Sequence, residues 1–579
     1  MKRPVAPAFV GALLALSLHV ALAALAAPAA PAAPAAAAID VTPHAPSSEE
    51  RKAAATIRAG AIRAHVKFLA SDLLEGRAPA TRGDQLARSY IASQMEAAGL
   101  KPGGDDGTYF QPVEIIGIRS RTEKVLTVAG PKGSASFVQD DDVMAFAGLP
   151  EPKVDLAGVP IVFVGYGIVA PEYAWDDYKG ADVKGKVLLF LNNDPEDDPA
   201  LFAGKTRLYY GRWTYKFEQA ARMGAVGALV IHTPESAGYG WTVVRNSWSG
   251  ERFTLEPEPE GAIPFKGWAT EEASKKIAAL GGHDLAELTA RAKKRDFHPV
   301  PLGVGLSISI RSEIRKAWTA NVIGFVPGHD PKLASEAVLF TSHHDHLGMK
   351  SDARPGEDAI YNGAVDNASG VAELLEVARV TAALASLGEP PSRSVYFAAV
   401  AAEEQGTLGS LHLAARPPVP LAKLVACLNV DSINVFGKTR DLSVTGFGRT
   451  TIDAEIVAVA AMQGRKVVGD RHPESGGFYR SDQFSFARAG VPAVYLGGGS
   501  DFVENAEKRR EAAREFGRKS YHQPSDEYRD SWDLEGAIDD ARLAFHVALR
   551  IANAAGRPEW KAGDEFAAVR KATMAAGSQ

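Results

Sequence analysis

The stretch Thr341-Ser342-His343-His344-Asp345-His346-Leu347-Gly348 places three histidines and an aspartate directly after the apolar run 337–340. The apolar run predicts a buried strand, and the polar cluster then lies where that strand opens into a loop. Polar groups at such a position must be paired or put to use, because an unpaired polar group in the interior is costly. The stretch therefore predicts either a ligand-binding site or a hydrogen-bonded structural cluster.

Four later segments also place polar groups at strand or loop boundaries. In an open α/β sheet, functional groups gather at the carboxyl ends of the strands. Taken singly, each segment also has an ordinary interpretation as a helix N-cap, a solvated acidic pair or a turn. The four segments are 362–370 before a helical pattern, Glu403-Glu404 after the strand 395–400, Asp431 closing a strand that begins near Leu424, and 521–526 with His522.

Together and in this order, the five segments resemble the M28 family of zinc peptidases, over roughly residues 57–110 and 302–555. The resemblance implies an α/β fold in which a mixed β-sheet is sandwiched by helices, the zinc exopeptidase fold. It also implies two Zn²⁺ ions per chain. The implied ligands are Asp366 as the bridge, His343 and Asp431 for one ion, and His522 and Glu404 for the other.

The same resemblance assigns catalytic roles. Glu403, next to the ligand Glu404, resembles the general base of the family, which takes a proton from water and passes it to the leaving amine. Tyr521 resembles a phenol that stabilises the tetrahedral oxyanion. Family members carry a non-proline cis peptide after the bridging carboxylate, which implies one between Asp366 and Asn367.

Asp345 is selected by a separate geometric argument. In an extended segment, residues two apart point to the same side, so His343 and Asp345 would share a face while His344 points away. The Asp345 carboxylate could then accept a hydrogen bond from the His343 imidazole and fix its tautomer. His346 falls where Leu347-Gly348 begins a loop, so strand alternation is not extended to it.

Other residues limit the alternatives. Cys427 is the one cysteine of the chain; it lies in an apolar strand and reads as a buried core residue. With one cysteine, metal must be held mainly by histidine and carboxylate. Neither His-Glu-x-x-His nor Gly-x-Ser-x-Gly is present, which argues against thermolysin-like and α/β-hydrolase enzymes. Ser481-Asp482 resembles a family segment near the substrate-binding wall, and its role is left open.

The chain begins like an exported protein. Lys2-Arg3, an apolar stretch and small residues suited to cleavage predict a signal peptide over residues 1–27, with an uncleaved anchor as the alternative. An Ala/Pro-rich linker follows over 28–50. Because no cysteine follows the signal, a lipoprotein anchor is not expected. We therefore expect a secreted or periplasmic protein without a stable membrane anchor.

The remaining chain is divided by composition and motif. Residues 51–117 predict N-terminal helices of a catalytic domain that resumes over 301–560, with a C-terminal tail at 561–579. Residues 118–300, called the inserted segment below, resemble a β-rich protease-associated (PA) domain through 162–167 and 220–228; an unrelated α/β insertion is the alternative. A role as a lid or in substrate access is expected for it.

These observations predict a di-zinc metallopeptidase acting on peptide substrates, with an aminopeptidase as the main hypothesis. The alternatives are a carboxypeptidase or dipeptidase of the same fold, a glutaminyl-cyclase-like acyltransferase, and a receptor-like protein without chemistry. The formal charge of −6 gives no overall basic character, so nucleic acid is not an expected partner.

Overall fold

The computed structural model describes residues 45–198, 201–256, 261–350 and 353–577. The predicted signal peptide and most of the predicted linker lie outside the described residues. Within these ranges, none of the helices combines the length and apolar content that crossing a bilayer requires.

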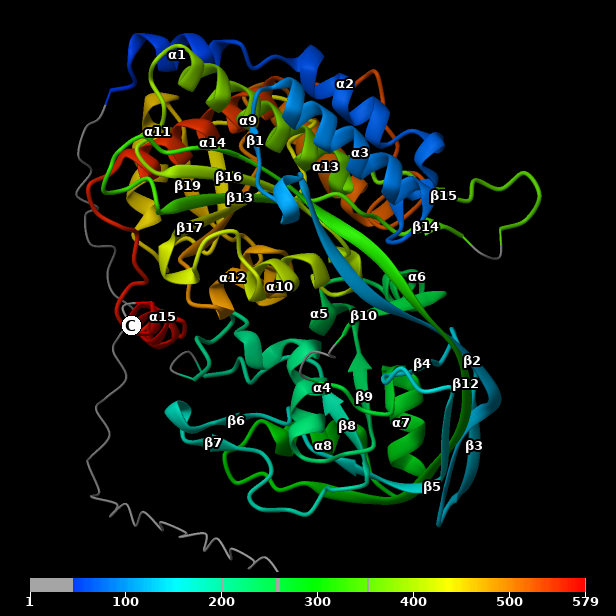
Figure 1. The fold of residues 1–579 in the computed structure, drawn as a ribbon. Coiled ribbons are helices and arrows are strands. Elements are labelled where there is room, and N and C mark those ends of the chain that lie inside the picture. The colour runs from blue at the N-terminus through cyan, green and yellow to red at the C-terminus, as the bar shows by residue number, and fades with distance from the viewer. Residues whose placement is uncertain (1–44, 199–200, 257–260, 351–352, 578–579) are drawn as a thin grey trace, which may run out of the picture. The chain divides into compact units, whose positions relative to one another are not determined.

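A mixed sheet forms the centre of the catalytic part (Figure 1). Four of its strands run parallel, and they are nearly continuous apolar runs because both of their faces are covered. One strand that runs antiparallel to these four extends the sheet on one side, and two such strands extend it on the other. The strands lie in the order β19 (Lys466–Gly469), β18 (Asp441–Thr445), β20 (Ala493–Gly497), β17 (Leu424–Asn429), β13 (Ala337–His343), β16 (Ser394–Val400) and β12 (Val300–Val326).

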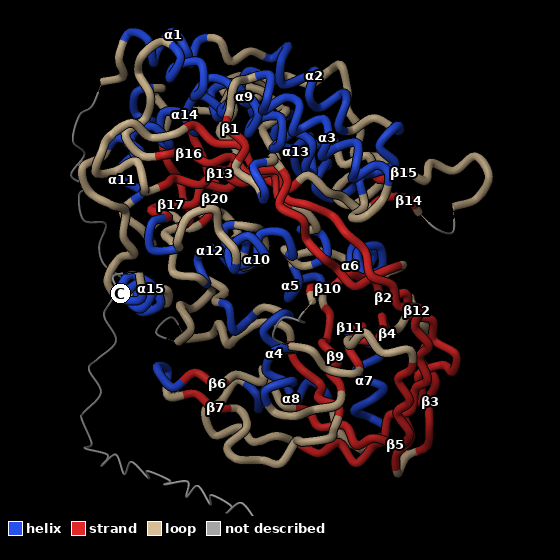
Figure 2. The backbone as a smooth tube through the Cα atoms, in the orientation of Figure 1, coloured by secondary structure: helices blue, strands red, loops and turns tan. Residues whose placement is uncertain are grey.

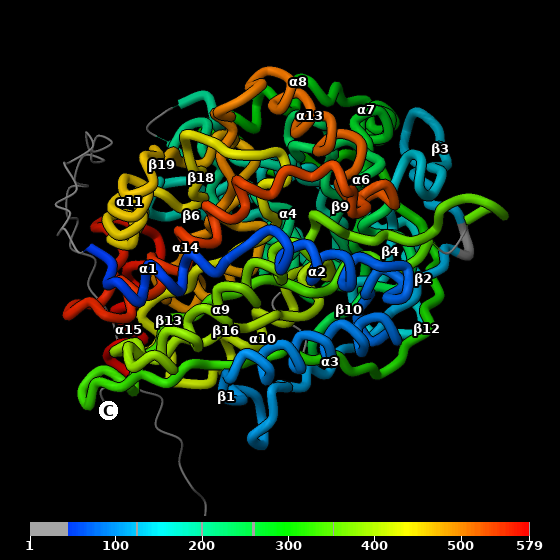
Figure 3. Tube along the Cα trace, turned by 90° about the horizontal axis from the view of Figure 1, so that it is seen from above, coloured from blue at the N-terminus to red at the C-terminus, as the bar shows by residue number. Residues whose placement is uncertain are grey.

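Helices cover both faces of this sheet (Figure 2). One face packs against α9 (Gly370–Ser386) and α14 (Glu535–Asn553), which are joined in one hydrophobic core by residues of α1 (Ser48–Ala55), α2 (Ala59–Leu69) and α3 (Arg82–Ala97). These helices lie above the strands in Figure 1, and Figure 3 looks down onto them. The opposite face contacts α10 (Leu408–Ala415) and α12 (Gln483–Arg488). The predicted mixed sheet sandwiched by helices is confirmed.

Two long antiparallel strands, β2 (Phe110–Gly130) and β12, carry the chain out of the catalytic part and back into it (Figure 1). Beyond them the sheet continues through strands that belong to the inserted segment, and these form a second hydrophobic core. The main elements there are β5 (Lys153–Phe163), β8 (Val187–Leu191), β9 (Gly227–His232), β11 (Phe265–Thr270), β4 (Val143–Ala147), α4 (Trp213–Arg222), α6 (Trp241–Trp248), α7 (Glu271–Leu280) and α8 (Leu285–Ala292).

Candidate metal centre

The candidate ligands come from the carboxyl ends of neighbouring parallel strands. His343 is the last residue of β13, Glu404 follows β16, and Asp431 follows β17. Because β13 pairs in parallel with both β16 and β17, the carboxyl ends of these three strands meet at one edge of the sheet. Asp366 enters this edge from the turn before α9, and His522 from the loop after α13 (Ala506–Lys519).

These side chains form two groups that share one carboxylate. His343 Nε2 lies 3.3 Å from Asp366 Oδ1 and 3.2 Å from Asp431 Oδ1. His522 Nε2 lies 3.2 Å from Asp366 Oδ2 and 3.2 Å from Glu404 Oε2. Asp366 therefore offers one oxygen to each group, which is the arrangement expected of a bridging ligand. All five residues predicted as ligands are brought together at these two points.

The donor set fits two divalent cations. Burial lowers the pKa of His343, but the nearby Asp431 and the hydrogen bonds to Asp366 and Asp431 outweigh it and hold this pKa well above its usual range. Burial and the carboxylates of Glu404 and Asp366 act on His522 in the same way, and its pKa is also well raised. Three clustered carboxylates thus favour positive charge nearby. Metal ions would supply this charge in place of protons on the imidazoles.

Glu403 and Tyr521 lie beside these groups. Burial, reinforced by Glu404, raises the pKa of the Glu403 carboxyl well above its usual range, although His343 opposes this. A carboxylate with a raised pKa is suited to accept a proton and return it. The Tyr521 ring stacks on His522 with centroids 4.0 Å apart, and both residues line the same cavity as Glu403.

Asp345 acts through a different contact from the one predicted. The His343 Nδ1 atom lies 3.3 Å from the backbone oxygen of Asp345, whereas the carboxylate Oδ1 is 3.8 Å away. The carboxylate instead accepts hydrogen bonds from the backbone N–H of Glu403 at 2.9 Å and of Glu404 at 3.3 Å. Strand geometry ends at His343, so the expected alternation does not reach Asp345, and this contact was predicted wrongly. Asp345 orients the Glu403-Glu404 turn.

The backbone around Asp366 is held by side chains from distant segments. The Asp526 carboxylate accepts hydrogen bonds from the N–H of Val365 at 2.9 Å and of Asp366 at 3.0 Å. Asn367 donates to Ser342 Oγ at 3.0 Å. The Asp366–Asn367 peptide bond is cis, as predicted.

Two further supports were missed by the sequence analysis. Arg77 is buried and donates hydrogen bonds to the carbonyl oxygens of Leu69, His344, Asn362 and Gly363, so that it ties the loop after β13 to the loop before Asp366. Its place in the turn between α2 and α3 gave no local signal of this role.

His346 is the second missed residue. Its Nδ1 lies 2.7 Å from Glu404 Oε1, and His346, Asp366 and Glu404 also offer ligand atoms within reach of one another. His522 contacts both carboxylates of its group, which favours His522 as the ligand and His346 as the residue that orients Glu404. The signal was present in the sequence, as the third histidine of the first cluster.

Ser481 supports Asp431 and is therefore not placed as a nucleophile. Its Oγ donates to Asp431 Oδ2 at 2.7 Å and accepts a hydrogen bond from Asn429 Nδ2 at 3.0 Å. Asp482 is fully buried behind it, and burial raises its pKa to about 6. Cys427 is likewise buried, as predicted.

Comparison with known proteins places this site in a family. The sequence profile described as "Peptidase family M28" matches residues 321–546, the segment that carries all five candidate ligands. This segment belongs to peptidase family M28.

Curated relatives of this M28 segment include enzymes of two kinds. Mouse "Aminopeptidase NAALADL1" is 33% identical over 138 residues, which are 24% of this chain and 16% of the mouse protein. The Caenorhabditis elegans "Glutamate carboxypeptidase 2 homolog" is 24% identical over 312 residues, 46% of this chain and 36% of that protein. The chain thus spans 16% of the length of the mouse relative and 36% of that of the nematode relative.

A solved structure extends the likeness of fold beyond the M28 segment. The aminopeptidase from Aneurinibacillus sp. strain AM-1 superposes with a TM-score of 0.51 at 18% identity. The superposition covers 88% of this chain and 97% of that chain. The two proteins therefore share the fold through most of their length.

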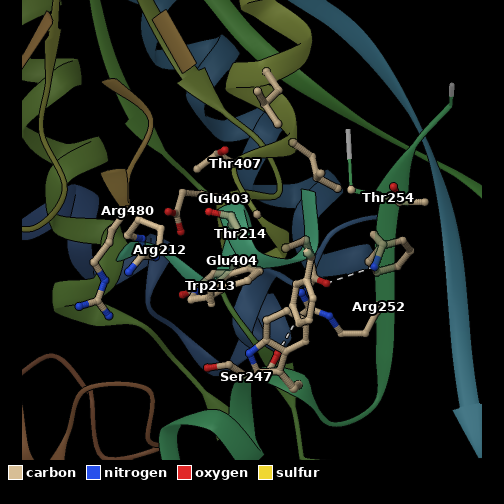
Figure 4. Close-up of a pocket in the computed structure, with 18 of the residues that line it drawn as sticks. Arg212, Trp213, Thr214, Ser247, Arg252, Thr254, Glu403, Glu404, Thr407 and Arg480 are labelled. Carbon is tan, nitrogen blue, oxygen red and sulfur yellow. Dashed lines mark hydrogen bonds between the residues drawn. The ribbon is translucent and has the colours of Figure 1, made fainter. Parts of the chain in front are cut away.

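The inserted segment reaches the M28 site directly. Ser247, in α6, has its Oγ 3.0 Å from His522 Nδ1, and Asn246 Nδ2 donates to the His522 carbonyl at 3.3 Å. A cavity of about 570 Å³, a volume typical of small-molecule sites, lies between the two parts of the chain (Figure 4). Its lining includes Glu403, Glu404, Tyr521 and His522 from the catalytic part and Arg212, Trp213, Tyr239, Ser247, Trp248 and Arg252 from the inserted segment.

Proposed function

We propose that the chain is a secreted or periplasmic zinc metallopeptidase, with two Zn²⁺ ions per chain, that removes N-terminal residues from peptides. One observation carries the proposal: the Asp366 carboxylate gives one oxygen to each of two histidine–carboxylate groups, and Glu403 lies beside both. The M28 profile and the aminopeptidase relatives support the reaction class.

Each candidate ligand has a place in this proposal. His343 and Asp431 would complete one metal site, and His522 and Glu404 the other, with Asp366 shared. Zinc ions bound there supply a polarised substrate carbonyl and a water of lowered pKa.

The remaining steps belong to side chains of the protein. Glu403 accepts the proton of the attacking water and delivers it to the leaving amine, a transfer that its raised pKa favours. Asp345 holds the Glu403 backbone in position for this transfer. The Tyr521 hydroxyl, on the cavity wall, donates a hydrogen bond to the oxygen that gains charge in the tetrahedral intermediate.

Two substitutions separate metal binding from proton transfer. Glu403→Gln should keep near-normal zinc content and lower kcat by about two to four orders of magnitude, because it removes the base but no ligand. Asp366→Ala should lose zinc as well as activity. Glu527→Gln, at an exposed position, is the control. The zinc content and the rate of hydrolysis of aminoacyl p-nitroanilides are measured for each variant. Equal zinc loss in both variants refutes the separate roles of Glu403 and Asp366, and full activity after chelation refutes the zinc peptidase.

The inserted segment is proposed to be a PA-like lid over the catalytic part. Its contact with His522 and its share of the cavity wall support this role. The signal peptide, on which export depends, lies outside the described residues, and N-terminal sequencing of the protein recovered from culture medium or periplasm tests it.

A further inference from the structure

Two arginines in the cavity are buried or half-buried and make neither an ion pair nor a side-chain hydrogen bond with any described residue. Arg212 is 5% exposed, and no carboxylate among the described residues forms an ion pair with it. Its Nε atom is buried and has no hydrogen-bond acceptor among the described residues. Arg480, half-buried, likewise makes no ion pair with any described residue; its guanidinium lies 5.0 Å from the centre of the Tyr239 ring.

The other arginines in this cavity make clear contacts. Arg252 donates to the Ser247 carbonyl at 2.6 Å and stacks on Trp248 at 4.4 Å, and Arg488 pairs with Glu218 at 3.3 Å. An unpaired buried charge is strongly unfavourable, and two unpaired cations near each other are worse. Burial lowers the pKa of Arg212 to about 9, and the positive charge of the nearby Arg480 adds to this shift.

A helix terminus adds to the positive field at the same place. Arg212 is the N-cap of α4, and its side chain does not cap the helix. Trp213 and Thr214, the first two residues of α4, line the cavity with it. The N-terminal end of a helix carries partial positive charge and favours anions. Figure 4 shows Arg212 and Arg480 on one wall, next to Glu403.

We propose that Arg212 and Arg480 form a carboxylate-binding subsite beside the catalytic centre, so that the preferred substrates are peptides that present a carboxylate to it. This inference rests on the proposed function and specifies its substrate class. Guanidinium groups bind carboxylates through charge-assisted, often bidentate hydrogen bonds. The carboxylate comes either from the free C-terminus of a short peptide or from an acidic side chain. A free C-terminus there favours short peptides, down to dipeptides, from which the enzyme still removes the N-terminal residue.

Matched substrates test the subsite. For the zinc-loaded full chain, kcat/KM is measured for Leu-Ala and Leu-Ala-amide, and for tripeptide amides that carry Glu or Gln at each position in turn. We expect the charged member of one pair to be preferred at least tenfold. Preference within the first pair identifies the C-terminal carboxylate, and preference within a Glu/Gln pair identifies the side chain.

Substitution assigns that preference to the arginines. Arg212→Met should lower kcat/KM for the charged member at least tenfold more than for its amide counterpart. The variant should fold, because it removes an unpaired buried charge, and its unfolding temperature checks this. Arg480→Met, at a half-buried position, repeats the test if Arg212→Met fails to fold. Arg440→Met, which removes a surface arginine paired with Asp501, is the matched control.

The outcomes separate this inference from the proposed function. Active enzyme that treats charged and amide substrates alike, or Arg212→Met and Arg480→Met proteins that lose both substrates equally, overturns the subsite and leaves the peptidase intact. If the zinc-loaded protein hydrolyses no peptide, the proposed function fails. Calorimetric binding of Leu-Ala against Leu-Ala-amide, to wild type and Arg212→Met, then decides the subsite alone: equal affinities in wild type overturn it.

Discussion

Replacing Ser247 with alanine removes a hydroxyl of the inserted segment that touches a candidate zinc ligand of the catalytic part. The Ser247 Oγ lies 3.0 Å from His522 Nδ1, and His522 Nε2 lies 3.2 Å from each of Asp366 and Glu404. For Nε2 to face a cation, Nδ1 must carry the ring proton, and the Ser247 hydroxyl is then its acceptor. The substitution leaves that N–H without its partner in a side chain that is 7% exposed.

The size of the effect follows from this contact. A buried polar group that loses its partner costs about 1–3 kcal/mol, which corresponds to roughly one to two powers of ten in an equilibrium constant. Loss of a residue that orients a metal-bound histidine typically lowers metal affinity or activity by about 10–100-fold. We therefore expect Ser247→Ala to weaken one of two zinc sites by about 10–100-fold and to leave the other unchanged.

Zinc titration against a chromophoric chelator measures the two affinities without any substrate, which separates this effect from changes in the cavity. Ser249→Ala is the matched control, because Ser249 lies two residues away and its hydroxyl donates a hydrogen bond to the Asn246 carbonyl at 3.3 Å and to no other described residue. Two zinc affinities within twofold of wild type in Ser247→Ala, with unchanged kcat, would refute the proposed role of this contact.

Three further substitutions test other parts of the structure. Arg77→Met should lower the free energy of unfolding by about 3 kcal/mol or more, since it leaves four carbonyl oxygens without their donor; a loss below 1 kcal/mol in denaturant titration contradicts this. Tyr521→Phe should keep zinc content and lower kcat by about 10–1000-fold, and unchanged kcat rules out the oxyanion role. Burial lowers the pKa of His65 below 6.5, so the unfolded chain binds that proton more readily and stability is lost as pH falls through 6.5. His65→Gln should therefore narrow the difference in unfolding temperature between pH 8 and pH 5, and an unchanged difference counts against it.

The sequence was informative where one short segment carries both a strand and its polar end. The runs before His343, Glu403 and Asp431 form adjacent parallel strands, so their order in the sequence already implied a common edge. The helix after Asp366 was also recognisable from its apolar spacing, and it spans Gly370–Ser386. Periodicity and strand order thus predicted the sheet and the convergence of the candidate ligands.

The contacts that the sequence did not predict join segments far apart in the chain. Ser247 and His522 are separated by 275 residues, and Arg77 and Asn362 by 285. No local pattern encodes such pairs, because they depend on how separate elements pack. The Asp345 contact failed for a local reason: its expected partner assumed that strand geometry continued past His343, where the strand ends.

The distribution of these contacts bears on what the inserted segment does. If the inserted segment only covered a site that was complete without it, its removal would change substrate specificity alone. Here the inserted segment supplies the hydrogen-bond partner of His522, a large share of the cavity wall, and Arg212, which pairs with no described carboxylate. Arg480 comes from the catalytic part, so the pair of arginines exists only when both parts are present. The inserted segment is therefore best understood as part of the site itself, contributing to the position of a candidate ligand and to the selection of charged substrates.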